Sequence, residues 1–329
     1  MSISVGFIGY RNHATRLKQI VQDHSVASVG TIYYPRDLDS SFGTTTLFPR
    51  LLKEDAVIIA SPSDTHYDYL RMLSDYRYSG YIFCEKPLVT SRKNLVDLRN
   101  LCLDFRKIFV NFNYRFSKFV SMFSEAVQDE TIGEPFHLHA VSTQGLAFSQ
   151  KYLDSWRSDK LRHVLGVTET KSIHYLDLAI FLFGNPTGID YCPRVISGNG
   201  TAIDTSTLSI KFEQGKTATV VASYAAPLRQ SMELLGSNGY LVYENENITL
   251  YGPRDTFSSD GRFDNPPSLA TYSFRESTTD FHTDSLNSAM NYFLKVCCDG
   301  GQFRKVDLDR TFITTETLLN LAGQDLCSI

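Results

Sequence analysis

Short apolar segments alternate with amphipathic segments along the first 115 residues of the chain. Continuous apolar runs are typical of strands buried on both faces of a parallel sheet. We expect strands at residues 3–8, 26–33, 56–60, 81–84 and 108–112, and helices at residues 14–21, 66–73 and 94–105. This alternation predicts a doubly wound parallel sheet, that is, an α/β Rossmann fold whose ligands bind at the carboxyl ends of the strands.

The second half of the chain has the two-residue period of half-buried strands. Apolar side chains occupy every second position over 208–212 and again over 218–222, with a turn at 213–216. This pattern predicts a hairpin with one solvated face. Further expected elements are strands at 240–243 and 248–251, a long loop at 255–273 and helices near 285–297 and 308–321. We therefore expect a C-terminal α+β domain with a largely antiparallel open sheet and helices to one side.

The length of 329 residues exceeds one comfortable hydrophobic core, so we expect two domains, at residues 1–117 and 118–329. The 32 basic and 36 acidic side chains give a net charge of −4, which lacks the basic excess that nucleic-acid binding needs. No apolar run approaches the roughly 18 residues of a membrane span. The N-terminal residues show no signal-peptide pattern, so we expect a cytoplasmic protein. The six cysteines form no C-x-x-C pair and predict free thiols rather than a metal site.

The turn after the first expected strand lies where a dinucleotide fingerprint belongs. Gly9, Arg11 and Ala14 occupy the three positions of the G-x-G-x-x-G spacing, in which glycines let the backbone approach a pyrophosphate. The first position fits, alanine is an accepted substitute at the third, and arginine at the second is bulky. A tight strand-to-helix turn explains the same spacing. The cofactor-binding candidates in this turn are Gly9, Tyr10, Arg11, Asn12 and His13.

The residues after the second strand bear on the choice between NAD and NADP. An NAD-binding sheet usually carries an acidic residue here for the ribose hydroxyls, and this chain has Tyr34 and Arg36 instead. A nearby arginine favours a 2′-phosphate, and the sequence therefore favours NADP over NAD. A solvated loop arginine is the alternative interpretation.

Polar residues follow the third and fourth strands at the same edge of the expected sheet. They are Ser61, Pro62 and His66 after the third strand, and Glu85, Lys86 and Pro87 after the fourth. A lysine there can act as a general acid or orient a substrate oxygen, with partial burial lowering its pKa. A solvated surface charge is the ordinary alternative for Lys86, and a helix-start residue bonded to backbone is the alternative for His66.

In combination these motifs resemble the Gfo/Idh/MocA oxidoreductase family. The resemblance rests on Gly9, the segment 58–62 with His66, the segments 85–87 and 113–116, and their order along the chain. It continues through Trp156-Arg157, the segment 166–174, Asp177 and the hairpin around Gly215. It implies an N-terminal nucleotide domain and a C-terminal domain whose open sheet forms a homodimer or homotetramer interface. It also implies NAD(P)-dependent oxidation or reduction of sugars, sugar nucleotides and polyols.

The resemblance also implies roles for individual residues. Lys86 matches a lysine that contacts the substrate and the nicotinamide ribose, so it belongs with Ser61, Pro62, His66 and Glu85 among the cofactor-binding candidates. His174 matches the histidine that moves the proton of the reacting hydroxyl, and we expect it near the first turn of a helix, which makes Lys86 and His174 the catalytic candidates. The substrate-binding candidates are Lys86, Tyr114, Arg115, Trp156, Arg157, Thr170, His174 and Asp177.

Three positions depart from the family pattern. They are Arg11, Thr170, where the family usually has an aspartate, and Ser172, where it has a glycine. The leading hypothesis is an NAD(P)-dependent oxidoreductase acting on a sugar, sugar-nucleotide or cyclitol hydroxyl. Alternatives are a non-catalytic sugar- or nucleotide-binding regulatory protein and a redox-neutral NAD-dependent lyase or glycosidase. Gln144, Trp156 and Arg157 favour a polar ligand, because arginine can bind carboxylate or phosphate; core packing is the commoner explanation for the aromatic residues.

Overall fold

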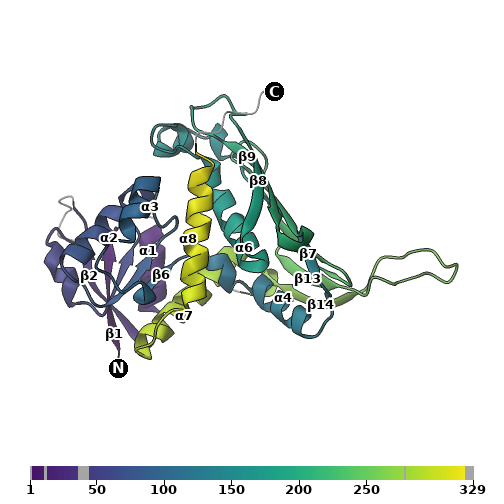
Figure 1. Ribbon diagram of the computed structural model, residues 1–329, viewed down its shortest axis with the longest axis horizontal. Coiled ribbons are helices and arrows are strands. Elements are labelled where there is room, and N and C mark those ends of the chain that lie inside the picture. Colours follow the sequence, from purple (N-terminus) through teal and green to yellow (C-terminus); the bar gives the residue numbers. More distant parts are fainter. Residues whose placement is uncertain (1, 11–12, 36–43, 278, 323–329) are drawn as a thin grey trace. The chain divides into compact units, whose positions relative to one another are not determined.

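The computed structural model describes residues 2–10, 13–35, 44–277 and 279–322 (Figure 1). The chain forms two compact units. The first unit contains residues 1–112 and 287–319, and the second contains residues 113–286 and 320–329. The chain therefore passes from the first unit to the second after Phe112, and the first unit also includes a segment from near the C-terminal end of the sequence.

The first unit is a six-stranded parallel sheet with helices packed on it. The strand order is β3-β2-β1-β4-β5-β6, and every neighbouring pair is parallel. The strands are β1 (Ile3–Ile8), β2 (Ala27–Tyr33), β3 (Thr44–Thr45), β4 (Ala56–Ile59), β5 (Tyr81–Cys84) and β6 (Ile108–Val110). The helices are α1 (His13–Gln22), α2 (His66–Asp75), α3 (Arg92–Leu98) and α8 (Lys305–Asn320), with part of α7 (Phe281–Cys298). This order confirms the doubly wound Rossmann sheet and places its switch point between β1 and β4.

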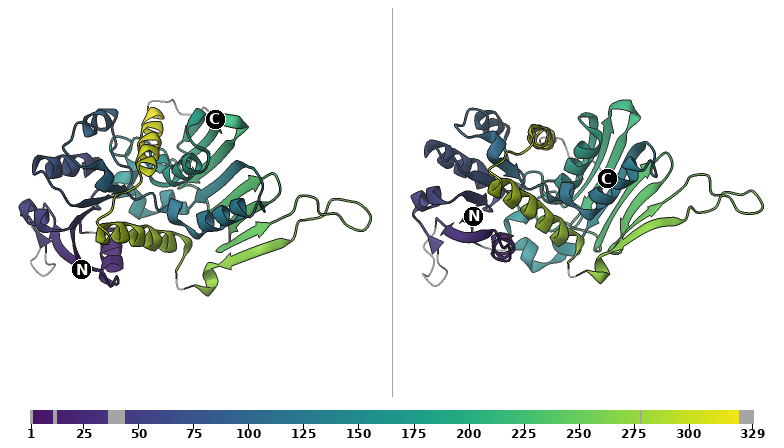
Figure 2. Two further views of the ribbon diagram at one scale, coloured as in Figure 1. Left: turned by 60° about the horizontal axis from the view of Figure 1, so that its bottom comes forward. Right: turned by 90° about the horizontal axis from the view of Figure 1, so that it is seen from below.

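The second unit is an eight-stranded mixed sheet with helices on one face (Figure 2). Its order is β14-β13-β12-β11-β7-β10-β9-β8, and only the pair β7–β10 is parallel among the described strands. The strands are β7 (Pro135–Thr143), β8 (Pro186–Arg194), β9 (Thr205–Phe212), β10 (Thr217–Ser223), β11 (Arg229–Gly236), β12 (Tyr240–Glu244), β13 (Asn247–Tyr251) and β14 (Ser268–Ser273). The helices are α4 (Lys118–Gln128), α5 (Gln150–Leu153) and α6 (Ile173–Phe183). The largely antiparallel open sheet is confirmed.

Short helical turns join these elements. One of them is a π-helical turn, Thr168–Ser172, that leads directly into α6. The 3-10 turns are Phe48–Lys53, Ser63–Thr65, Phe105–Lys107, Asn113–Phe116, Gly145–Phe148, Trp156–Ser158, Glu213–Gly215 and Phe274–Glu276. Among the described residues, no helix has the length and apolarity that crossing a membrane requires.

Two expectations about elements are wrong. The helix expected at 94–105 is α3, Arg92–Leu98, which begins at the Ser91 cap and ends early because the chain turns to donate Cys102 N–H to Ser74 Oγ. The loop expected at 255–273 ends in a strand, β14, because residues 268–273 pair with β13 and gain its hydrogen bonds. In the structure, most of the two C-terminal helices belongs to the first compact unit.

Aromatic packing explains where the C-terminal helices lie. Phe293 of α7 packs against Phe83 of β5 with ring centroids 5.2 Å apart, and Phe303 packs against Phe109 of β6 at 5.4 Å. Tyr81 OH also donates a hydrogen bond of 2.9 Å to Gly301 O. These side chains complete the core beside β5 and β6, and their pairing over more than 190 residues is invisible to local sequence patterns.

Gly9 follows β1 with φ +111°, a conformation that disfavours side chains. A Cβ at this position would lie 2.8 Å from Ala60 O. Gly300 has φ +61° with nothing within 4 Å of its Cβ position, so it serves as a matched control. We expect Gly300→Ala to lower the free energy of unfolding by roughly 1 kcal/mol and Gly9→Ala by roughly 1–3 kcal/mol more. Urea denaturation measures both, and equal effects would contradict the backbone clash at Gly9.

Candidate active site

The turn after β1 is shaped for close approach to a ligand. Gly9 N–H donates to Tyr33 O at 3.1 Å, and α1 begins four residues later at His13. Because helix N-termini attract anions and α1 has no acidic residue in its first turn, this end of α1 suits a pyrophosphate. The rings of Tyr10 and Tyr34 lie beside one another with centroids 6.2 Å apart. Arg11, Asn12 and Arg36, three of the predicted cofactor-binding residues, lie outside the described residues.

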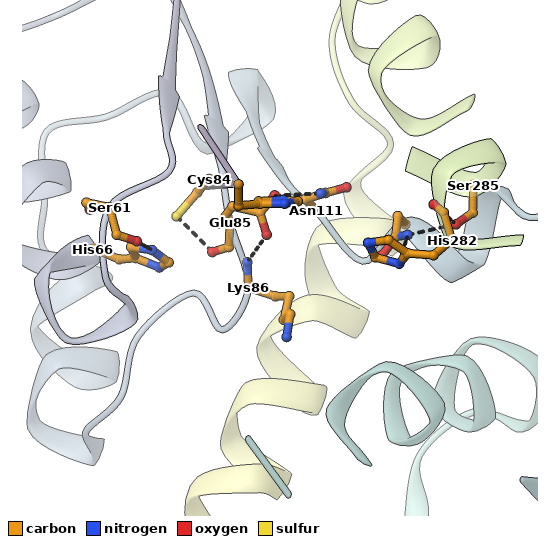
Figure 3. A network of polar contacts seen from close by, with 10 residues as sticks. Ser61, His66, Cys84, Glu85, Lys86, Asn111, His282 and Ser285 are labelled. Carbon is orange, nitrogen blue, oxygen red and sulfur yellow. Dashed lines mark hydrogen bonds and ion pairs between the residues drawn. The ribbon is translucent and has the colours of Figure 1, made fainter. Parts of the chain in front are cut away.

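Glu85 is the centre of a buried polar network at the carboxyl ends of the sheet (Figure 3). Its side chain follows β5, and the residue is only 8% exposed. Glu85 Oε1 lies 2.8 Å from His13 Nε2 at the start of α1 and accepts a 2.7 Å bond from Asn111 Nδ2 after β6. One carboxylate therefore ties together the ends of three elements that surround the expected nucleotide site.

The surroundings of Glu85 hold it in the charged form. Burial by itself raises the pKa of a carboxyl group, but the charge and hydrogen bond of His13, the bond from Asn111 and the charge of Lys86 together lower the pKa of Glu85 to about 2. Lys86 N–H is 3.3 Å from Glu85 Oε2, while the Lys86 side chain extends away from that carboxylate in Figure 3. The ammonium group of Lys86 therefore points away from the polar network around Glu85.

His66 connects the two polar loops that follow β4 and β5. Its Nδ1 lies 2.8 Å from Pro87 O, and its Nε2 lies 3.1 Å from Ser61 O. Burial lowers the pKa of His66, against the opposite effect of the two carbonyl groups. The observed contacts of His66 are those of a residue that positions backbone. Its contact with a cofactor stays a prediction, as does that of Ser61 and Pro62.

In the second unit, polar side chains hold the π-helical turn before α6 against four adjacent strands. Thr168 Oγ1 pairs with Tyr191 OH on β8 at 2.9 Å, and Ser172 Oγ pairs with Ser206 Oγ on β9 at 3.1 Å. The other two contacts are Thr170 Oγ1 with Tyr224 OH, just after β10, at 2.5 Å, and Lys171 Nζ with Ser142 Oγ on β7 at 3.3 Å. Single π-helical turns occur frequently at functional sites. Here the turn fixes the residue that begins α6.

His174 lies in the first turn of α6, as the sequence predicts. Its imidazole stacks on the ring of Tyr114 with centroids 4.7 Å apart and an interplanar angle of 26°. Gln230 Nε2 on β11 donates to Tyr114 OH at 3.1 Å and lies 3.3 Å from Tyr175 OH. One face of the His174 ring therefore packs on a tyrosine whose hydroxyl group is itself hydrogen-bonded.

Arg115 and Asp177, both predicted to bind substrate, bind each other. Arg115 Nε donates to Asp177 Oδ2 at 2.8 Å and Nη2 to Oδ1 at 2.5 Å, and the two side chains are 6% and 1% exposed. This bidentate pair joins the turn at 113–116 to α6 and so fixes the Tyr114–His174 stack between them. A contact of either residue with substrate stays a prediction.

Trp156 and Arg157 lie on the short turn after α5. The Arg157 guanidinium lies 4.6 Å from the centroid of the Trp156 ring, and it forms a hydrogen bond with Tyr224. Burial raises the pKa of Tyr224, against the hydrogen bond from Thr170 and the charge of Arg157. Tyr224 thus connects Arg157 to Thr170, two of the predicted substrate-binding residues.

Several residues of these networks were not among the predicted site residues. They include Asn111, Ser142, Lys171, Tyr224 and Gln230. A polar residue at the end of a fully apolar strand is a usable signal for Asn111, since it stands directly after β6. The remaining four are recognisable only after the strands are paired. Within the described residues, no group of three or more His, Cys, Asp or Glu side chains is placed to hold a metal ion.

A dinucleotide fits the residues of the first unit. Gly9 has no side chain to keep a ligand away from the backbone of the turn, α1 has no acidic residue in its first turn, and the described residues at the end of β2 include no carboxylate to repel a phosphate. The residues that would hold it are Gly9, Tyr10 and His13 near the pyrophosphate, with Tyr34 beside the adenosine.

Comparisons with known proteins agree with this geometry. Residues 3–111 match the model of an oxidoreductase family with an NAD-binding Rossmann fold, and residues 120–242 match the GFO/IDH/MocA C-terminal domain. No curated protein matches the sequence. The fold and these matches show that the protein is an NAD-binding oxidoreductase. The chain belongs to the Gfo/Idh/MocA family.

Solved structures with the same fold are distant in sequence. A myo-inositol dehydrogenase from Corynebacterium glutamicum is 17% identical with a TM-score of 0.74, covering 98% of this chain and 96% of that one. A levoglucosan dehydrogenase in complex with NADH is 16% identical with a TM-score of 0.80, covering 98% and 97%. A UDP-N-acetylglucosamine 3-dehydrogenase from Acidithiobacillus ferrooxidans is 16% identical with a TM-score of 0.75, covering 98% and 97%.

The lowered pKa of Glu85 predicts a defined pH dependence of stability. Because the folded-state pKa of about 2 lies below the ordinary value of 4.5, the stabilisation is complete above pH 4.5 and is lost as the pH falls towards 2. At pH 7 Glu85→Gln should lower the free energy of unfolding by on the order of 3 kcal/mol, and this difference should shrink below pH 4.5. Urea denaturation at several pH values measures it. Glu316→Gln, at an exposed position, is the control. If the difference in stability between the wild type and Glu85→Gln did not change with pH, the low pKa of Glu85 would be contradicted.

The buried Arg115–Asp177 pair predicts a large structural cost for removing one partner. Asp177→Asn leaves the Arg115 guanidinium uncompensated and should lower the free energy of unfolding by about 3–5 kcal/mol without any ligand present. Glu244→Gln breaks the exposed pair with Arg229 and should cost about 1 kcal/mol or less. Denaturant titrations compare the two variants. An equally small effect in both would show that the Arg115–Asp177 pair does not support the fold.

Proposed function

We propose that this protein is an NAD(P)-dependent dehydrogenase that oxidises a hydroxyl, or reduces the matching ketone, of a sugar, sugar nucleotide or cyclitol. The observation that carries the proposal is His174, an imidazole fixed in the first turn of α6 by the Tyr114 stack. An imidazole with a pKa near neutrality suits reversible proton transfer at a hydroxyl group. The relatives named for myo-inositol, levoglucosan and UDP-N-acetylglucosamine support this substrate class.

In this proposal the residues of the chain orient the substrate and move its proton. Bound nicotinamide supplies the hydride acceptor or donor. His174 takes the proton of the reacting hydroxyl in the oxidative direction and returns it in reduction. Lys86, whose side chain extends away from the Glu85 carboxylate, binds the reacting oxygen and the nicotinamide ribose, and its positive charge stabilises the developing alkoxide.

NADP is the preferred cofactor in this proposal. The described residues at the end of β2, Tyr33 to Pro35, offer no carboxylate for the ribose 2′-hydroxyl, and Arg36 follows in the sequence. An arginine at this position accommodates a 2′-phosphate. The rings of Tyr10 and Tyr34 offer apolar surface beside the adenine.

A homodimer or homotetramer formed through the eight-stranded sheet is also part of the proposal. The helices cover one face of the sheet (Figure 2). Half-buried side chains such as His139, Thr219 and Val221 alternate along β7 and β10 with the buried ones and so lie on the other face. Such a face suits a second copy of the chain. Light scattering should give two or four times the 37.2 kDa chain mass, and a particle of 37.2 kDa would contradict this.

Replacing either catalytic candidate should abolish most turnover. With NAD or NADP and a substrate panel that includes myo-inositol and levoglucosan, we expect Lys86→Ala and His174→Ala to lower kcat by about 10²–10⁴. The controls are Lys93→Ala on α3 and His24→Ala in the turn after α1, which should keep wild-type rates. Absorbance at 340 nm follows net NAD(P)H formation, which a redox-neutral reaction would not produce. Full activity in both Lys86→Ala and His174→Ala would contradict the proposal.

A further inference from the structure

Lys171 is half-buried, and few protein groups compensate its positive charge. Within the described part of the chain its Nζ makes one hydrogen bond, 3.3 Å long, to the neutral Ser142 Oγ, and it forms no ion pair. By contrast, Lys211, Lys216 and Lys295 each have a carboxylate within 3.3 Å. Burial lowers the pKa of Lys171, and no charged neighbour offsets this shift.

An ammonium group in this position costs the fold free energy. Lysine side chains ordinarily extend to water or pair with a carboxylate, because a desolvated charge is unfavourable. A hydrogen bond to one hydroxyl leaves two of the three N–H donors of Lys171 without a protein partner among the described residues. Such an arrangement is typical of a site that a ligand completes.

The surroundings of Lys171 point to an anionic ligand. Ser142 and Gln144 lie on the same face of β7, since the backbone stays extended at Gln144 and its N–H continues the ladder to Ser223 O. The Gln144 amide has no hydrogen-bond partner within the described residues, so it is available as a second donor. Lys171 and Gln144 thus present donors above the same strand end.

The other charged groups of this region act on Tyr224. The positive charge of Arg157 and the negative charge of Glu169 both reach the Tyr224 hydroxyl and have opposite effects on its pKa. Neither charge contributes to the lowered pKa of Lys171, which is caused by burial. His174 follows Lys171 by three residues, so the cation lies on the turn that leads directly into the helix carrying His174.

We infer that Lys171, assisted by Gln144, binds an anionic substituent of the substrate, a carboxylate or a phosphate. The substrate class is then a sugar acid or a sugar phosphate rather than a neutral sugar or cyclitol. This inference rests on the proposed function for the identity of the reacting hydroxyl. Lys171 would determine specificity, because it contacts a part of the substrate that does not react.

Matched sugars test the inference directly. Glucose, galactose and mannose are each compared with their uronate and their 6-phosphate by isothermal titration calorimetry on the full-length protein saturated with NADH or NADPH. At least one acidic sugar should bind about tenfold or more tightly than its neutral counterpart, as expected for a hydrogen bond between charged groups. Lys171→Met should remove this preference and leave the neutral sugar unchanged. Lys160→Met, at an exposed lysine of the same unit, should keep it.

The outcomes separate the possible explanations. A preference for uronate or for phosphate identifies the group, whereas no preference for any acidic sugar, or a preference that survives Lys171→Met, overturns the inference. Lys171→Met should also melt at or above the wild-type temperature, since it removes a desolvation cost; a marked fall would assign Lys171 a purely structural role and overturn the inference. Absence of NADH and NADPH binding would instead refute the proposed function, and titration without nucleotide would still test the anion site.

Discussion

The arrangement of the second unit depends on one constraint, the polar attachment of the turn Thr168–Ser172 to the sheet. Four side chains of five consecutive residues bond to β8, β9, β7 and the residue after β10. Buried polar groups are costly unless they are paired, so these bonds specify a single position for the start of α6. The position of His174, the proposed proton carrier, follows from that register.

The first unit uses the same kind of constraint with a single charge. Glu85 holds the start of α1, the end of β5 and the segment after β6 through His13 and Asn111, and the low pKa of the carboxyl group shows that these partners outweigh its burial. The family E-K-P motif therefore has two separable roles in this chain. The glutamate organises the loops, and the lysine extends away from them towards the chemistry that we propose.

The sequence predicts the elements whose cause is local and fails where the cause is distant. Continuous apolar runs located β1, β4 and β5, which are buried on both faces, and alternating apolar positions located the hairpin β9–β10, which is buried on one face. The packing of α7 against β5 depends on a partner far along the chain, and β14 pairs with β13 across the loop between them, so neither followed from a local pattern. The same applies to the site. His174 and Lys86 carry a motif, whereas Tyr224 and Lys171 became recognisable only through the strands that they contact.

The departures at Thr170 and Ser172 have a structural explanation in this account. Both hydroxyls bond to the sheet, Thr170 to Tyr224 and Ser172 to Ser206, so these residues hold the turn in place. The central claim is that the Rossmann unit binds a nicotinamide dinucleotide, and the most direct test is titration of the protein with NADH and with NADPH, followed by nicotinamide fluorescence. The account predicts saturable binding of one nucleotide per chain, tighter for NADPH than for NADH. No saturable change with either nucleotide would contradict it.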